Sequence, residues 1–258
     1  MTRLLKKKSI IVLGGVDVAK EKDFSYGIWL NPWKSVLVRY GLTHASAVIA
    51  VDDFLKSEAM KLARYDGGNI RTIPTGYDPE FWKPSGNKEP RVLMVASSPN
   101  EARARLKGID VFLRVAQLLP NTQFEIIGFT SDAAPAFVIP SNVVCSPFVP
   151  QELLLHSYQR SKVYCQLSFR EGLPNSLCEA MLCECVPVGS NVGGIPTAIG
   201  ETGYLVEYNN DGQIAEAIRQ ALASSPDSGK KARLRIASHF SLPQREDSLK
   251  KLIGELLP

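Results

Sequence analysis

The sequence predicts an α/β protein in which helices cover both faces of parallel, doubly wound sheets. Short apolar runs rich in β-branched residues alternate with longer helical patterns along most of the chain. Strands separated by such helices are joined in parallel by right-handed crossovers. The 258 residues are 45% hydrophobic and 22% charged, which is typical of a globular protein at the border between one domain and two.

The first third of the chain opens with a β-branched run at residues 9–13, which predicts a buried strand ending at Gly14-Gly15. Further strands are expected at residues 45–51 and 70–73, and a helix at residues 33–40. A second helix begins at Asp52 or Asp53, since either carboxylate could accept hydrogen bonds from its first turn. A turn at residues 74–78 then leads to a polar linker at residues 85–89.

The rest of the chain repeats the alternation with more elements. The expected strands are at residues 91–96, 123–127, 143–144, 163–167, 186–188 and 204–206. The expected helices are at residues 109–118, 150–160, 175–184, 211–223, 230–239 and 243–256. Loops 97–108, 128–141 and 168–175 each follow a strand, so they should converge at one edge of the sheet, where ligands bind.

Charge and cysteine content narrow the class of protein. A net charge of +4 is too weak and scattered to indicate nucleic-acid binding. The basic run of Arg3 and residues 6–8 is expected to be a solvated end, with contact to the inner face of an anionic membrane as the alternative. Five cysteines, an odd number, favour reduced thiols in a cytoplasmic protein. Cys183-Glu184-Cys185 has no histidine near it in sequence, so no metal site is expected.

Residues 169–194 contain the pattern with the clearest chemistry: an acidic loop, a helix, a short strand and a Gly-Gly turn. A helix that starts after a strand and loop presents free backbone N–H groups to an anion, here those of Gly172, Leu173 and Asn175. Pro174 has no N–H group to donate. Glu171 and Glu179 bracket the loop and the helix start and could accept hydrogen bonds from hydroxyls. A site of this kind suits a ligand with phosphates in the middle and a sugar at either end, and a nucleotide-sugar is such a ligand.

The run EGLPNSLCEAM at residues 171–181 resembles the signature of the family 4 retaining glycosyltransferases, also called group 1 glycosyl transferases. The resemblance continues through residues 186–188, 193–196 and 202–206. It implies the GT-B fold, with two Rossmann-like lobes. Here the N-terminal lobe (residues 1–84) is shortened, the donor lobe (residues 85–240) is complete, and residues 241–258 form an amphipathic helix.

The resemblance also implies roles for individual residues. Glu179 matches the glutamate that accepts hydrogen bonds from the donor ribose, and Glu171 the one beside the transferred sugar. Lys107 matches the lysine that neutralises the diphosphate leaving group, where fixed cations lower the barrier. Either Arg103 or Arg105 would assist it, although both could equally belong to a solvated basic loop.

Further positions follow from the same resemblance. Gly128 matches the glycine beside the nucleobase, and Gly193-Gly194 the turn near the phosphates and sugar. Thr197 stands where the family commonly has a glutamate, and Gly14 stands where it has a histidine near the donor sugar. Asp17 could contact an acceptor or sugar hydroxyl, or simply cap its own turn.

The predicted function is retaining, metal-independent transfer of a sugar from a nucleotide-sugar to an acceptor hydroxyl. The nucleotide-sugar is a substrate, and no cofactor is expected. The acceptor is a saccharide, a lipid-linked molecule or a small molecule. One alternative is a donor-binding subunit that needs a partner chain to complete its short N-terminal lobe. The others are a GT-B epimerase and a phosphate-binding Rossmann enzyme, the last disfavoured because no GxGxxG follows a first strand.

Overall fold

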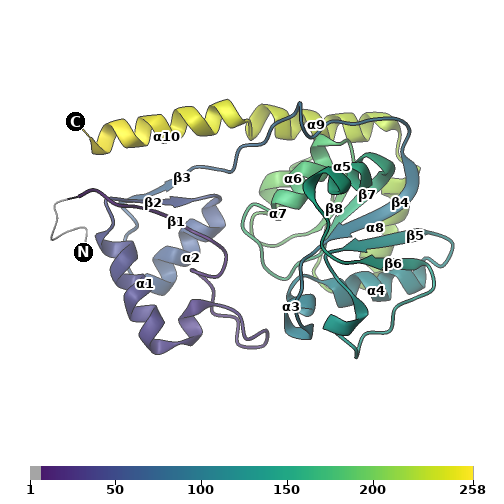
Figure 1. Ribbon diagram of the computed structural model, residues 1–258, viewed down its shortest axis with the longest axis horizontal. Helices are drawn as coiled ribbons and strands as arrows, with labels where there is room; N and C mark the ends of the chain where they lie inside the picture. The colour runs from purple at the N-terminus through teal and green to yellow at the C-terminus, as the bar shows by residue number, and fades with distance from the viewer. Residues whose placement is uncertain (1–6, 258) are drawn as a thin grey trace. The chain divides into compact units, whose positions relative to one another are not determined.

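The computed structural model describes residues 7–257 and divides the chain into two compact units (Figure 1). Unit 1 combines Met1–Gly76 with Leu242–Pro258, and unit 2 is Tyr77–Ser241. Each unit contains one parallel sheet with helices packed against it. The predicted α/β class with two lobes, the N-terminal one shortened, is therefore confirmed.

Unit 1 has a three-stranded sheet in the order β1-β2-β3. One face of the sheet packs on the helices between the strands, with Leu42, Val48 and Leu55 in the shared core. The opposite face packs Ala47 and Ile49 on the C-terminal helix α10. The elements are β1 (Ile10–Val12), η1 (Ile28–Leu30), α1 (Pro32–His44), β2 (Ala47–Ala50), α2 (Asp53–Ala63), β3 (Ile70–Thr72) and α10 (Leu242–Leu256).

The strand β1 was expected to be buried, and this expectation was wrong. Ile10 and Val12 are 40% and 55% exposed. β1 is the outermost strand of its sheet, so only one of its edges is paired. Among the capping alternatives, the structure selects Asp52, whose carboxylate accepts a hydrogen bond of 2.8 Å from the backbone N–H of Phe54.

Unit 2 has a six-stranded parallel sheet in the order β6-β5-β4-β7-β8-β9. Its core includes an edge-to-face contact between Phe112 and Phe124, whose ring centroids are 5.1 Å apart. The strands are β4 (Glu89–Val95), β5 (Gln123–Ile127), β6 (Val143–Ser146), β7 (Ser161–Gln166), β8 (Val186–Ser190) and β9 (Tyr204–Val206). The helices are α3 (Glu101–Leu106), α4 (Ile109–Leu118), η2 (Ser131–Ala133), α5 (Gln151–Arg160), α6 (Asn175–Leu182), α7 (Ile195–Ile199), α8 (Asp211–Ala223) and α9 (Pro226–His239).

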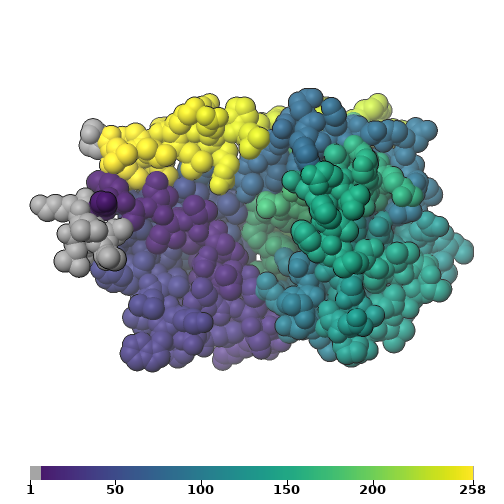
Figure 2. Space-filling view, viewed as in Figure 1, coloured from purple at the N-terminus to yellow at the C-terminus, as the bar shows by residue number. Residues whose placement is uncertain are grey.

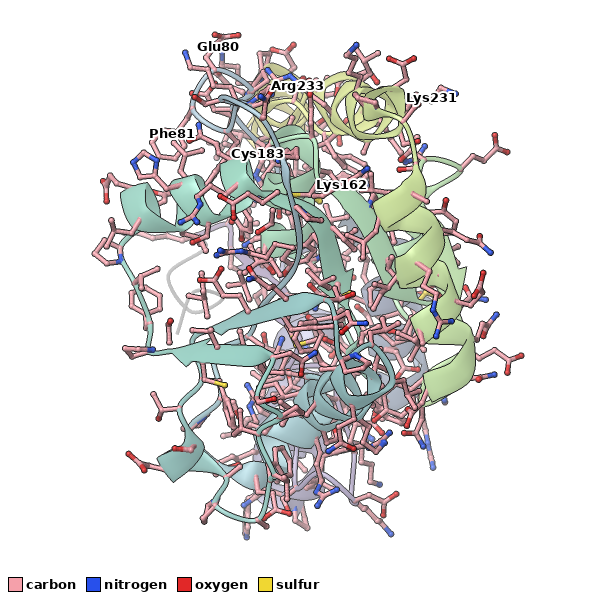
Figure 3. The ribbon with its side chains drawn as sticks, turned by 90° about the vertical axis from the view of Figure 1, so that its right-hand side faces the viewer. Glu80, Phe81, Lys162, Cys183, Lys231 and Arg233 are labelled. Atoms are coloured by element: carbon pink, nitrogen blue, oxygen red, sulfur yellow. The ribbon has the colours of Figure 1, made fainter. Side chains whose placement is uncertain are left out.

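The boundary between the units differs from the predicted one at residues 84 and 85. The segment after Gly76 already belongs to unit 2, because Tyr77 and Trp82 are buried there. Arg233 on α9 donates hydrogen bonds to the carbonyls of Pro79 and Trp82, and Figure 3 shows it near the segment that carries Glu80 and Phe81. The buried rings of Tyr77 and Trp82 and the hydrogen bonds from Arg233, which is 151 positions from Trp82, hold this segment in unit 2.

The C-terminal helix was predicted as a separate element, whereas the structure makes α10 part of unit 1. Leu252 packs against Ala47, Ile49 and Ile73, and Arg245 donates a hydrogen bond of 2.6 Å to the Pro74 carbonyl. Figure 2 shows the C-terminal segment, in yellow, lying along the N-terminal part of the chain, in purple. Within residues 7–257, no helix is both long and apolar enough to cross a membrane.

Candidate functional site

The candidate site lies in unit 2, at the carboxyl ends of the neighbouring strands β4, β5 and β7. Backbone hydrogen bonds connect the loops that follow these strands. The N–H of Ser98 donates to the carbonyl of Gly128 (3.3 Å), and that of Phe169 to the carbonyl of Leu106 (2.9 Å). The three loops therefore converge as the parallel topology predicts.

Lys107 and Glu171 meet at this edge of the sheet, although 64 positions separate them in the sequence. The lysine Nζ lies 2.5 Å from the glutamate Oε1. Both side chains are largely buried, with 26% and 15% of their surface exposed. A cation and a carboxylate predicted to act on the same donor are thus brought into direct contact.

Two glycines allow this close approach. Gly108 has φ = 75°, and a Cβ atom there would lie 2.0 Å from the carbonyl oxygen of Leu167. Gly193 has φ = 56°, and its Cβ would lie 2.1 Å from the carbonyl oxygen of Glu171. No other residue could occupy either position without moving the backbone. The predicted Gly-Gly turn therefore lies directly against the Glu171 loop, where Gly194 also donates to the Glu171 carbonyl (3.2 Å).

A buried polar network holds Glu171, and the sequence analysis did not anticipate it. The Glu171 Oε1 accepts hydrogen bonds from Ser168 Oγ (3.0 Å) and Gln166 Nε2 (3.4 Å). Gln166 Oε1 accepts in turn from Tyr164 (3.3 Å) and from Ser176 on α6 (3.4 Å). Gln166 is the last residue of β7 and Ser168 lies in the loop that follows it, and both are buried. Polar residues directly after the apolar run at residues 163–165 are the signal that could have identified them, because buried polar groups need partners.

The helix α6 begins at Asn175, after a proline N-cap that has no side-chain acceptor. No capping side chain from that residue therefore satisfies the first-turn N–H groups, which is the arrangement that favours an anion. Asn175 is exposed, and its Oδ1 accepts a hydrogen bond of 2.9 Å from the Tyr77 hydroxyl. Leu173 is buried, and Gly172 is half-buried. Their contacts with a donor remain a prediction.

Glu179 lies in the second turn of α6, four residues after the first residue of the helix. It is half-buried, and its Oε2 accepts a hydrogen bond of 3.2 Å from the hydroxyl of the fully buried Tyr158. Burial raises the pKa of Glu179 to about 7, against the opposing effect of the Tyr158 hydrogen bond. The carboxylate is thus held among apolar neighbours at a cost that a surface glutamate would not carry.

The two candidate arginines lie on the short helix α3, which the sequence analysis expected to be a loop. Asn100 caps this helix by accepting from the backbone N–H of Arg103 (3.0 Å). Arg105 binds Glu101 at 2.7 Å, and its guanidinium lies 5.2 Å from the centroid of the Phe137 ring. Arg105 is therefore engaged in contacts of its own, and a role for Arg103 or Arg105 as a second cation remains a prediction.

Asp17 belongs to unit 1 and caps its own turn. Its Oδ2 accepts a hydrogen bond of 2.7 Å from the backbone N–H of Gly14. Of the two roles predicted for Asp17, the structure shows the capping of its own turn. A contact between Asp17 and an acceptor or sugar hydroxyl remains a prediction. All five cysteines are free thiols, and within residues 7–257 no group of His, Cys, Asp and Glu is arranged to hold a metal ion.

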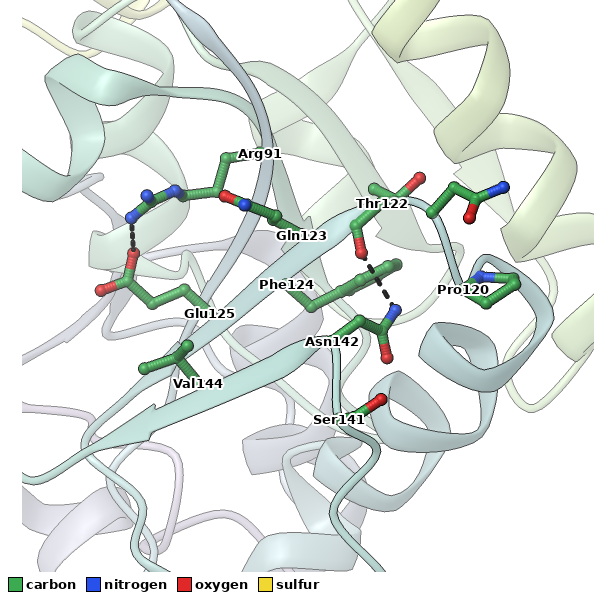
Figure 4. Close-up of a pocket in the computed structure, with 10 residues that line it drawn as sticks. Arg91, Pro120, Thr122, Gln123, Phe124, Glu125, Ser141, Asn142 and Val144 are labelled. Carbon is green, nitrogen blue, oxygen red and sulfur yellow. Dashed lines mark hydrogen bonds and ion pairs between the residues drawn. The ribbon is translucent and has the colours of Figure 1, made fainter.

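A cavity of about 640 Å³ lies elsewhere in unit 2 (Figure 4). Its lining includes the Arg91–Glu125 ion pair and Asn142, whose Nδ2 donates to the Thr122 carbonyl (3.0 Å). Thr122 and Asn142 precede β5 and β6, so the cavity reaches the amino ends of these strands. It is therefore distinct from the edge that carries Lys107 and Glu171.

Curated proteins of similar sequence align with most of this chain. The chain is 24% identical over 237 residues to D-inositol 3-phosphate glycosyltransferase of Mycolicibacterium smegmatis, covering 84% of this chain and 55% of that protein. The chain thus spans about half the length of the curated relatives that it matches.

Solved structures show the same fold. Sucrose-phosphate synthase from Thermosynechococcus elongatus superposes with a TM-score of 0.79 at 19% identity, covering 98% of this chain and 70% of that one. The Anabaena protein Alr3699/HepE in complex with UDP-glucose gives 0.80 at 14% identity, covering 98% and 74%. The profile of the family "Glycosyl transferases group 1" matches residues 80–238. This match spans more than half of the chain and includes Lys107, Glu171 and Glu179, and the chain therefore belongs to the group 1 glycosyl transferases.

Proposed function

We propose that the protein transfers a sugar from a nucleotide-sugar to an acceptor hydroxyl with retention of configuration and without a metal cofactor. The contact between Lys107 and Glu171 carries the proposal, since it joins the two groups predicted to act on the leaving group and on the transferred sugar. The Anabaena structure with UDP-glucose supports a uridine nucleotide as the first donor to test. The D-inositol 3-phosphate glycosyltransferases support a hydroxylated small-molecule acceptor.

In this mechanism the bond between the anomeric carbon and the diphosphate breaks, the acceptor oxygen bonds to that carbon, and the acceptor hydroxyl proton passes to the departing diphosphate oxygen. Negative charge develops on the diphosphate as it leaves. Lys107 and the uncapped N–H groups of α6 are preorganised to stabilise that charge. Glu171, held by Ser168 and Gln166, contacts the transferred sugar, and Glu179 accepts hydrogen bonds from the ribose.

The comparisons do not favour the alternative of a donor-binding subunit that is inactive without a partner chain. A hexosyl donor, activity of the isolated chain, a partner chain, and a cytoplasmic location at the inner membrane face all remain predictions. A direct first test is calorimetric titration of the purified chain with UDP and UDP-glucose, alongside the other nucleoside diphosphates. Failure of every nucleotide to bind would contradict the proposal.

A substitution tests the assignment of Lys107. Lys107→Met should lower kcat for sugar transfer about 10²- to 10³-fold, the usual effect of removing a group that stabilises developing charge. Lys231→Met on α9 is the matched control, because Lys231 is an exposed lysine with no predicted role at the site. Steady-state release of nucleoside diphosphate measures both variants. Equal turnover by the two would show that Lys107 does not stabilise the leaving group.

A further inference from the structure

The helix α1 carries an apolar stripe that no described residue covers. Trp33, Val36, Leu37 and Tyr40 are 83%, 58%, 70% and 56% exposed. Their spacing of three, four and seven residues places them on one side of the helix. Four large apolar side chains gathered on one exposed face indicate an interaction surface, whereas scattered single ones need no explanation.

The stripe faces away from the sheet of unit 1. Val38 and Leu42 pack into the core beneath α1, together with residues of β2 and α2. At 3.6 residues per turn, the stripe lies about half a turn from these two residues. A strand added at the open edge of β1 would extend the sheet sideways and would not lie over this outer face. The stripe therefore calls for a partner that approaches from outside the α/β layers.

The charge around the stripe indicates the chemistry of that partner. Lys34 and Arg39 are both exposed on α1, and the helix contains no aspartate or glutamate. Residues 1–50 contain eight Lys and Arg but three Asp and Glu, a net charge of +5, whereas the whole chain carries +4. Residues 51–258 thus have a net charge of −1. The excess positive charge is concentrated in the part of the sequence that contains the stripe.

We propose that α1 is a membrane-surface helix that binds the headgroup region of an anionic lipid bilayer. Trp33 and Tyr40 are the residue types that favour the boundary between water and lipid, and Val36 and Leu37 would enter the acyl region. Lys34 and Arg39 would interact with the negatively charged headgroups. The proposal concerns a face of unit 1 and is independent of the donor chemistry proposed for unit 2.

Vesicle co-sedimentation of the whole chain tests this proposal. The chain should bind phosphatidylcholine vesicles that contain about 30% phosphatidylglycerol, and should bind vesicles of phosphatidylcholine alone at least tenfold more weakly. Trp33→Ser combined with Leu37→Gln should weaken binding to the anionic vesicles at least tenfold. Lys34→Glu alone should weaken it about tenfold and reduce its dependence on salt.

The matched control is Val144→Ser combined with Phe148→Ser, which removes two side chains that are 61% and 80% exposed in unit 2. This control should bind as the unaltered chain does. Circular dichroism and unfolding midpoints should be unchanged in all variants, because the altered positions are exposed. The proposal is overturned if the unaltered chain ignores anionic vesicles, or if the Trp33 and Leu37 variant binds equally well. Self-association by light scattering that depends on the stripe, without vesicle binding, would assign this face to a protein contact.

Discussion

At the scale of single residues, Glu179 is the side chain whose environment makes the sharpest prediction. Burial raises its pKa from 4.5 to about 7. Between these two values the folded state binds more protons than the unfolded state, so the free energy of unfolding should fall as pH rises from about 4.5 to about 7. Glu179→Gln should lack this fall. Urea denaturation across that pH range measures it, and parallel curves for the two proteins would contradict the raised pKa.

The same residue predicts how donor binding depends on pH. A carboxylate can accept hydrogen bonds from two ribose hydroxyls, so affinity for a nucleoside diphosphate should increase as pH rises through about 7. Glu179→Ala should weaken binding by about 1.5–3 kcal/mol, the range for hydrogen bonds to a charged group. Calorimetry with UDP gives both values. An affinity unchanged in the alanine variant would exclude the ribose contact.

Tyr158 is predicted to act as a positioning residue through Glu179. Its hydroxyl donates to Glu179 and lowers the pKa of that carboxyl group. Tyr158→Phe should therefore shift the pH at which UDP binding strengthens to higher values. Tyr65→Phe is the control, because the buried Tyr65 hydroxyl has no hydrogen-bond partner within residues 7–257. A pH profile unchanged in Tyr158→Phe would leave this tyrosine with a packing role only.

At the scale of elements, the turn between α3 and α4 should depend strictly on its glycine. Gly108→Ala would place a Cβ atom against the Leu167 carbonyl at a left-handed φ, and should cost about 1–3 kcal/mol. Gly212→Ala on α8 is the matched control in the same unit, because its Cβ would have no contact closer than 3.9 Å. The control should be neutral or stabilising by up to about 1 kcal/mol. Denaturant midpoints compare the two variants, and equal midpoints would show that the turn can relax.

At the scale of the whole molecule, unit 1 should depend on a helix that is last in the sequence. Leu252→Ala removes the α10 side chain that packs on Ala47, Ile49 and Ile73, and should destabilise unit 1 by about 2–4 kcal/mol. Hydrogen exchange of β2 and β3 amides should accelerate, while amides of β4 and β7 should not change. Leu257→Ala, at a position that is 64% exposed, is the control. Equal exchange in both variants would mean that α10 does not stabilise unit 1.

The local pattern of the sequence predicted much of unit 2. The strand at Gln123–Ile127 and the helices Ile109–Leu118 and Asp211–Ala223 match their expected bounds, because periodicity and flanking turns define them. The short helices α3 and α7 were not expected, since five or six residues are too few to show a helical period. β1 was expected to be buried because a short apolar run looks the same in a central strand and in an edge strand.

By itself, the sequence determined the fold class, the family and the converging loops that contain Lys107, Glu171 and Glu179. These follow from local spacing and from a motif that is continuous in the chain. Tertiary structure alone decided the contact between Lys107 and Glu171, the network through Gln166 and the burial of Glu179 beside Tyr158. It also decided that α10 packs in unit 1 and that the apolar side chains on one side of α1 are exposed. Each of these depends on which residues distant in sequence become neighbours, and the chain acquires those neighbours only when its sheets assemble.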